Sequence, residues 1–117
     1  MSIDGELWHP IEDFPEYEVS SFGRIRRNGR VKATHVFNGR ANRRPWSRVT
    51  LHENGTTHYR AVHVLVANAF LGERPQGMTV HFRNGDTTDC RVDNLYYDIA
   101  ETLDLRAKAA AKRGRIK

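Results

Sequence analysis

The sequence predicts an α+β fold, in which a small antiparallel β module precedes a helix, a two-stranded hairpin and a second helix. Three observations lead to this prediction. Up to about residue 62, short runs of alternating apolar and polar residues are separated by turn-forming residues, as in antiparallel strands. At residues 63–70 the apolar period becomes helical. Two short apolar runs, at residues 78–82 and 95–97, then enclose a loop rich in Asn, Asp, Gly and Thr.

Turn chemistry locates the strands of the N-terminal part. Asn28-Gly29 is a strong two-residue turn, and the chain on its two sides is predicted to pair as a small antiparallel unit. Residues 46–52 alternate with a period of two, residues 53–56 form a second turn, and residues 57–62 return as the partner strand. Trp46 is expected in the core rather than on a base-stacking surface.

Two segments have helical character. In residues 63–70 the apolar side chains fall on one stripe, and Gly72 with Pro75 marks the end of this helix. From about residue 100 to 112, Ala, Leu, Lys, Arg and Glu dominate, which predicts a second helix with a basic outer face. Residues 113–117 are predicted to be a basic tail that orders only on a partner.

Length and composition set the outer limits. A chain of 117 residues can form one domain with a modest core, or two small modules packed on each other. Hydrophobic residues make up 38%, and no apolar run approaches the length of a membrane span. No signal peptide is visible, so the protein is expected inside the cell. The single cysteine, Cys90, excludes an internal disulfide and a zinc cluster built from cysteines, and is interpreted as a structural residue.

The charge pattern indicates a polyanion as partner. The net charge is +5 and the pI is about 9.8, and the basic residues gather in three clusters while acidic residues crowd the first eighteen positions. Such clusters contact phosphates by charge and counterion release without reading sequence. The residues predicted to contact DNA are Arg24, Arg26, Arg27, Arg43, Arg44, Arg106, Lys108, Lys112, Arg113 and Arg115.

The most specific motif combines the first helix with the hairpin. It consists of Val62-His63-Val64-Leu65-Val66-Ala67-Asn68-Ala69-Phe70, then Val80-His81-Phe82-Arg83-Asn84-Gly85-Asp86 and Thr88-Asp89-Cys90-Arg91-Val92-Asp93-Asn94-Leu95. This stretch resembles HNH endonucleases of the phage and homing type. Near the N-terminus, Trp8-His9-Pro10-Ile11 and Tyr17-Glu18-Val19-Ser20-Ser21-Phe22-Gly23-Arg24-Ile25-Arg26 resemble the NUMOD4 module that commonly precedes this nuclease.

The resemblance implies a fold and a domain division. Residues 1–60 would form the NUMOD4-like β module, and residues 61–117 an HNH-like ββα-metal domain with a basic C-terminal helix and tail. The partner implied is double-stranded DNA. The setting implied is the cytoplasm of a phage-infected or prophage-bearing bacterial cell. The family has monomeric and homodimeric members, and both states stay open.

The resemblance also implies a chemistry. HNH enzymes hydrolyse DNA phosphodiesters with a hairpin histidine as general base, an asparagine that holds the loop, and a divalent metal bound by the hairpin and the following helix. Oxygen and imidazole donors with open positions suit Mg or Mn, and no structural zinc is expected. Carried over, His81 and Asn94 are the candidate catalytic residues, and His81 and Thr102 are the candidate metal ligands.

This chain departs from the family pattern at the general base. Alignment without gaps places Phe82 at the base position and His81 one residue before it, so His81 serves as base only if a bulge re-aims it. Three hypotheses stay open. They are an active metal-dependent nickase or endonuclease, a DNA-binding protein without chemistry, and a protein that occupies a host nucleic-acid enzyme.

Overall fold

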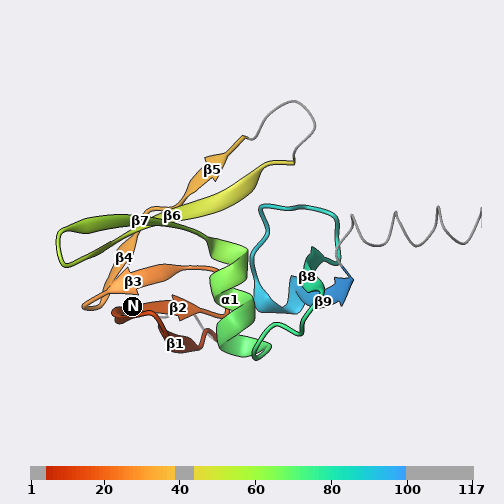
Figure 1. Cartoon of the computed structure of the whole chain (residues 1–117), viewed down its shortest axis with the longest axis horizontal. Helices are drawn as coiled ribbons and strands as arrows, with labels where there is room; N and C mark the ends of the chain where they lie inside the picture. The colour runs from red at the N-terminus through yellow and green to blue at the C-terminus, as the bar shows by residue number, and fades with distance from the viewer. Residues whose placement is uncertain (1–4, 39–43, 100–117) are drawn as a thin grey trace, which may run out of the picture.

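The computed structural model describes residues 5–38 and 44–99, which form three antiparallel sheets and one α-helix (Figure 1). The predicted α+β class and the N-terminal β module are confirmed. The predicted second helix and the basic tail lie outside the described residues. The elements, in chain order, are β1 (Trp8–Ile11), β2 (Phe14–Ser20), β3 (Ile25–Arg27), β4 (Arg30–Lys32), β5 (His35–Phe37), β6 (Trp46–Glu53), β7 (Thr56–Ala61), α1 (Val62–Phe70), β8 (Met78–Phe82), the 3-10 turn η1 (Val92–Asn94) and β9 (Leu95–Ile99).

The first sheet has four strands in the order β1-β2-β3-β4. Its last hairpin turns at Asn28 and Gly29, whose φ angles are +50° and +78°. Two successive positive φ angles are what a tight two-residue hairpin turn requires, and Asn and Gly adopt them most readily. The predicted turn is confirmed, and it pairs β3 with β4. The pairing of β3 with β2 on its other side places Arg26 opposite Glu18.

The second sheet has three strands in the order β5-β6-β7. Along β6 the side chains alternate, so that Ser47, Val49 and Leu51 are buried while Trp46 and Arg48 lie on the opposite face. Trp46 is only partly buried, and its ring lies 5.2 Å from that of Phe37 on β5. The expectation that Trp46 belongs to the core is therefore wrong, because the register of β6 turns it to the outer face.

Helix α1 lies between the N-terminal sheets and the C-terminal hairpin (Figure 1). It buries Val62, Leu65, Val66 and Ala67, and it ends where the Leu71 amide donates to the Ala67 carbonyl. The stripe of apolar residues predicted the helix and the buried side correctly. This position lets α1 carry its first turn, which includes His63, to the hairpin.

The third sheet is the hairpin of β8 and β9, with a long loop that ends in η1. The pairing runs in one register from Met78 opposite Ile99 to Phe82 opposite Leu95. One hydrophobic core joins all three sheets and α1, with Val19 from β2, Leu51 from β6 and Leu95 from β9 among its members. The two predicted domains therefore share this core, and the boundary between residues 60 and 61 stays a prediction.

Candidate functional site

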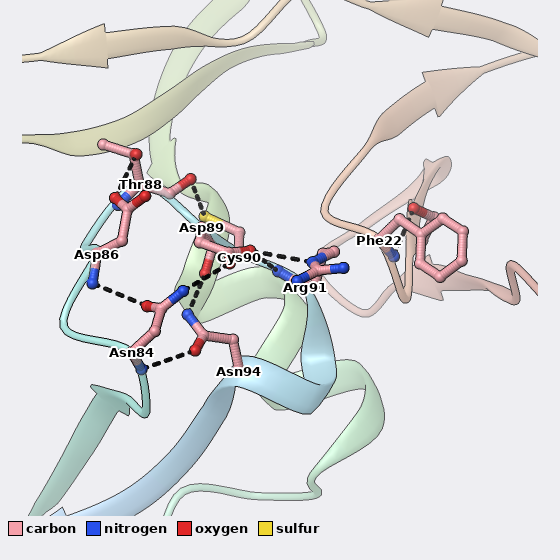
Figure 2. A network of polar contacts seen from close by, with 9 residues as sticks. Phe22, Asn84, Asp86, Thr88, Asp89, Cys90, Arg91 and Asn94 are labelled. Atoms are coloured by element: carbon pink, nitrogen blue, oxygen red, sulfur yellow. Dashed lines mark hydrogen bonds and ion pairs between the residues drawn. The ribbon is translucent and has the colours of Figure 1, made fainter.

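Asn94 fastens the hairpin loop from inside (Figure 2). Its side chain is buried, accepts a hydrogen bond of 3.0 Å from the Asn84 amide and donates one of 2.9 Å to the Asp89 carbonyl. Its own carbonyl accepts from the Arg83 amide at 2.7 Å. One side chain thus holds the beginning and the middle of the loop to its end.

The polar residues of the loop also bond to one another. The Asn84 side chain donates to the Asp89 carboxylate at 3.0 Å and accepts from the Asp86 amide at 2.8 Å. Asp86 accepts from both the hydroxyl and the amide of Thr88, and these two bonds hold the pKa of the Asp86 carboxyl below its ordinary value. Short Asx turns of this kind fix the loop locally. The cluster of Asn, Asp and Thr therefore builds the loop, as Figure 2 shows.

The loop is docked on the N-terminal sheet. The Val92 amide donates to the Ser21 carbonyl at 2.8 Å. Nearby, Gly23 has a φ of +86°, and a Cβ there would lie 3.0 Å from that of Cys90. Burial raises the pKa of the Cys90 thiol to about 11, so this thiol stays protonated at neutral pH. In this position Cys90 is a packing residue.

His81 lies on the same face of the hairpin as Tyr96, its partner on β9. Its ring stacks on Tyr96 at 5.5 Å and 28°, and its Nε2 donates to the Ile99 carbonyl at 2.9 Å. Because β8 pairs with β9 without a register shift, no bulge re-aims this side chain. The catalytic and metal-binding roles of His81 stay proposals.

Phe82 points to the other face of the strand. Its ring packs against the core and meets His63 of α1 edge-on, at 5.1 Å and 64°. Burial lowers the pKa of the His63 imidazole from 6.5 to about 4, and its buried Nδ1 has no hydrogen-bond partner in the described part of the chain. At the position of the expected base there is therefore a phenyl ring, with a neutral imidazole beside it.

The predicted metal ligands are only partly placed. Thr102 lies outside the described residues. Within residues 5–38 and 44–99, no three His, Cys, Asp or Glu side chains come close enough to hold a metal ion. His81 supplies one imidazole, and Mg²⁺ is held mainly through oxygen ligands. The described residues do not form a metal site by themselves.

The predicted DNA-contacting arginines of the first sheet are engaged in ion pairs. Arg24 pairs with Glu6 at 2.6 Å, and the Glu6 side chain is fully buried. Arg26 pairs with Glu18 at 2.6 Å and lies 4.0 Å from the centre of the Trp8 ring. Arg27 pairs with Glu16 at 2.7 Å. These arginines contribute less free positive charge than their sequence suggests.

Of the remaining residues predicted to contact DNA, the structure describes one. Arg44 is exposed beside the start of β6. The structure describes none of the other predicted contacts, which are Arg43, Arg106, Lys108, Lys112, Arg113 and Arg115. Sequence reasoning missed Arg48, which lies between the rings of Phe37 and Tyr59 at 4.7 Å from each. The alternation along β6 placed Arg48 on the same face as Trp46, but the ring from β5 was not foreseeable locally.

Comparison with known proteins agrees with this architecture. The family described as HNH endonuclease matches residues 60–97, and the NUMOD4 motif matches residues 6–59. The chain belongs to the HNH/NUMOD4 family. Together the two matches include both β sheets of the N-terminal part, α1 and most of the β8–β9 hairpin, here called the HNH hairpin.

A solved structure shares the fold. Its title is "DNA binding and cleavage by the HNH homing endonuclease I-HmuI", and it superposes with a TM-score of 0.71 at 21% sequence identity. The match covers 95% of this chain and 61% of the other, so this chain corresponds to about three fifths of that one. No curated protein matched the sequence. Among the described residues, no helix is long and apolar enough to cross a membrane.

Proposed function

We propose that this HNH-family protein binds double-stranded DNA and hydrolyses its phosphodiester backbone in the presence of Mg²⁺ or Mn²⁺. The observation that carries the proposal is the hairpin loop held by Asn94, because a fixed loop between two strands is what positions an HNH site against a phosphate. The family match to residues 60–97 supports a nuclease-like function. In this proposal His81 and Thr102 hold the metal and Asn94 orients the loop.

The basic surface supports the DNA partner. Arg44 at the start of β6 is exposed, and Arg48 on the outer face of the same strand is held between two rings. Arg26 and Arg27 are each paired with a glutamate, so a phosphate reaches them only by displacing that carboxylate, which costs little for a surface salt bridge. Binding of this kind depends on salt and is uniform across sequences.

A second candidate is DNA binding without cleavage, and a specific observation favours it. Phe82 fills the base position and packs on His63, while the Nε2 of His81 is bonded to the Ile99 carbonyl on the opposite face. A phenyl ring cannot accept a proton. In this case the hairpin keeps its fold but has no nuclease activity, and the function of the protein is to bind DNA.

The experiment is nicking of supercoiled plasmid with Mg²⁺ or Mn²⁺, which compares the protein with its His81→Ala and Phe82→His variants. Nicking that disappears in His81→Ala supports the nuclease. An inert protein that gains nicking with Phe82→His supports binding without cleavage.

Binding to the same plasmid in EDTA is the control. It shows whether each variant still recognises DNA, and circular dichroism shows whether it is folded. The absence of DNA binding by the folded protein at low salt contradicts both candidates.

A further inference from the structure

The hollow beside Phe82 is a shallow, open pocket of about 340 Å³ at the meeting point of three segments. Pro45 and Trp46 come from the start of β6, His63 from α1, and Phe82 and Thr87 from the hairpin. The Thr87 hydroxyl donates to the Pro45 carbonyl, and this bond joins the hairpin loop to the start of β6. A volume of this size is at the lower end for pockets that take small ligands.

The pocket walls are aromatic and carry little charge. The Trp46 ring packs against Phe37, and the Phe82 ring packs edge-on against His63. Both rings are therefore held in place without a ligand. The His63 imidazole is neutral at physiological pH because burial lowers its pKa to about 4. No carboxylate lines the pocket, and one imidazole does not hold a metal ion. The lining is therefore mainly apolar and aromatic, which suits an uncharged ring.

Two polar features narrow the choice of ring. Arg44, which makes no ion pair within the described part of the chain, is an exposed cation in the lining and can pair with a phosphate next to the ring. Thr87 also lines the pocket, and its hydroxyl, which donates to the Pro45 carbonyl, keeps lone pairs that can accept a hydrogen bond from the polar edge of a ligand. A nucleobase attached to its phosphate has a stacking face, a polar edge and a charge in this combination.

We propose that the pocket formed by Trp46, His63 and Phe82 binds one unstacked nucleobase of DNA, with Arg44 on the adjacent phosphate. This inference rests on the proposed DNA binding and deepens it. Phe82 then has a positive role, because a ring at this position can stack on a base. Unpairing a base costs free energy, so the pocket favours DNA in which a base is already outside the stack.

The test measures affinity by fluorescence anisotropy, in EDTA, for three duplexes of one sequence. The first is fully paired, the second carries a single bulged adenosine, and the third carries an abasic bulge at the same place. We expect about tenfold tighter binding of the bulged adenosine than of the abasic bulge. The two bulges share a flexible backbone, so the difference reports the base itself.

Variants assign the difference to the pocket. Phe82→Leu keeps an apolar side chain and removes the aromatic face, and we expect it to bind the two bulges equally. Val31→Ala shortens an exposed apolar side chain on β4, outside the pocket, and should keep the preference. Arg44→Gln should weaken binding to all three duplexes by a similar factor.

The outcomes separate this inference from the proposed function. Tight but equal binding of both bulges by the unaltered protein overturns the base pocket and leaves DNA binding intact. A preference that survives in Phe82→Leu also overturns it. No binding to any duplex at low salt overturns the proposed function, and the base pocket with it.

Discussion

The hairpin loop and the pocket beside it are neighbours with opposite character. In the loop, the side chains of Asn84, Asp86 and Asn94 form hydrogen bonds with other loop residues and with the loop backbone. In the pocket, the Nδ1 of His63 has no partner among the described residues, and Phe82 offers none. The polar motif therefore maintains the shape of the loop, while the pocket beside it presents mainly apolar surface.

The largest effect is expected from breaking the loop. Asn94→Ala removes two side-chain hydrogen bonds from a buried position and leaves the Asn84 amide without its acceptor. We expect a loss of about 2–4 kcal/mol in the free energy of unfolding. Urea denaturation measures it. The control is Asp93→Ala, an exposed neighbour in η1, which should change stability by less than about 0.5 kcal/mol. Similar losses for the two variants would show that Asn94 does not hold the loop.

Lowering the pH should reduce the stability of the protein through His63. The pKa of His63 is 6.5 when unfolded and about 4 when folded, so the unfolded chain binds a proton first as the pH falls. The stability from this group is present above pH 6.5 and is lost between about pH 6.5 and 4, to a total approaching ~3 kcal/mol.

The charged group that shares the pocket lining with His63 is Arg44, and burial of the imidazole is the cause of its lowered pKa. Denaturation midpoints measured between pH 4 and 7 test the effect. His63→Gln should flatten this part of the profile. An unchanged profile in His63→Gln would show that other groups cause the acid sensitivity.

A smaller effect is expected where the loop meets the first sheet. Gly23→Ala places a Cβ 3.0 Å from that of Cys90, at a φ of +86° that side chains rarely adopt. We expect a cost of about 1–3 kcal/mol. Gly29→Ala has a similar φ with nothing near its Cβ, so it isolates the backbone part of the cost. Equal losses at both positions would show that contact with Cys90 costs nothing.

The smallest effect is expected on the salt dependence of DNA binding, which should differ between an exposed arginine and a paired one. Arg44 is exposed in the pocket lining, whereas Arg26 is paired with Glu18 and covers Trp8. Arg44→Gln should reduce the slope of log K against log salt by about 0.9, the value for one phosphate contact. Arg26→Gln should reduce it less. A larger change for Arg26 would move the DNA contact to the first sheet.

Much of the local structure was predictable. Asn28-Gly29 and Asn54-Gly55 specify tight turns because Asn and Gly tolerate positive φ angles, which both pairs adopt. The apolar stripe of α1 and the two apolar runs of the HNH hairpin were read from periods of 3.6 and 2. These rules act over a few residues, so the sequence alone is sufficient to apply them.

The sequence by itself determined most of the elements, the turns and the HNH motif. Only the tertiary structure decided what surrounds Phe82. His63 and Phe82 are far apart in the chain and meet because α1 packs its buried face against the same core as β8. The outward turn of Trp46 and the pairing of Arg24 with buried Glu6 likewise depend on which strands become neighbours. Such contacts are set by the packing of the whole core, which no local pattern contains.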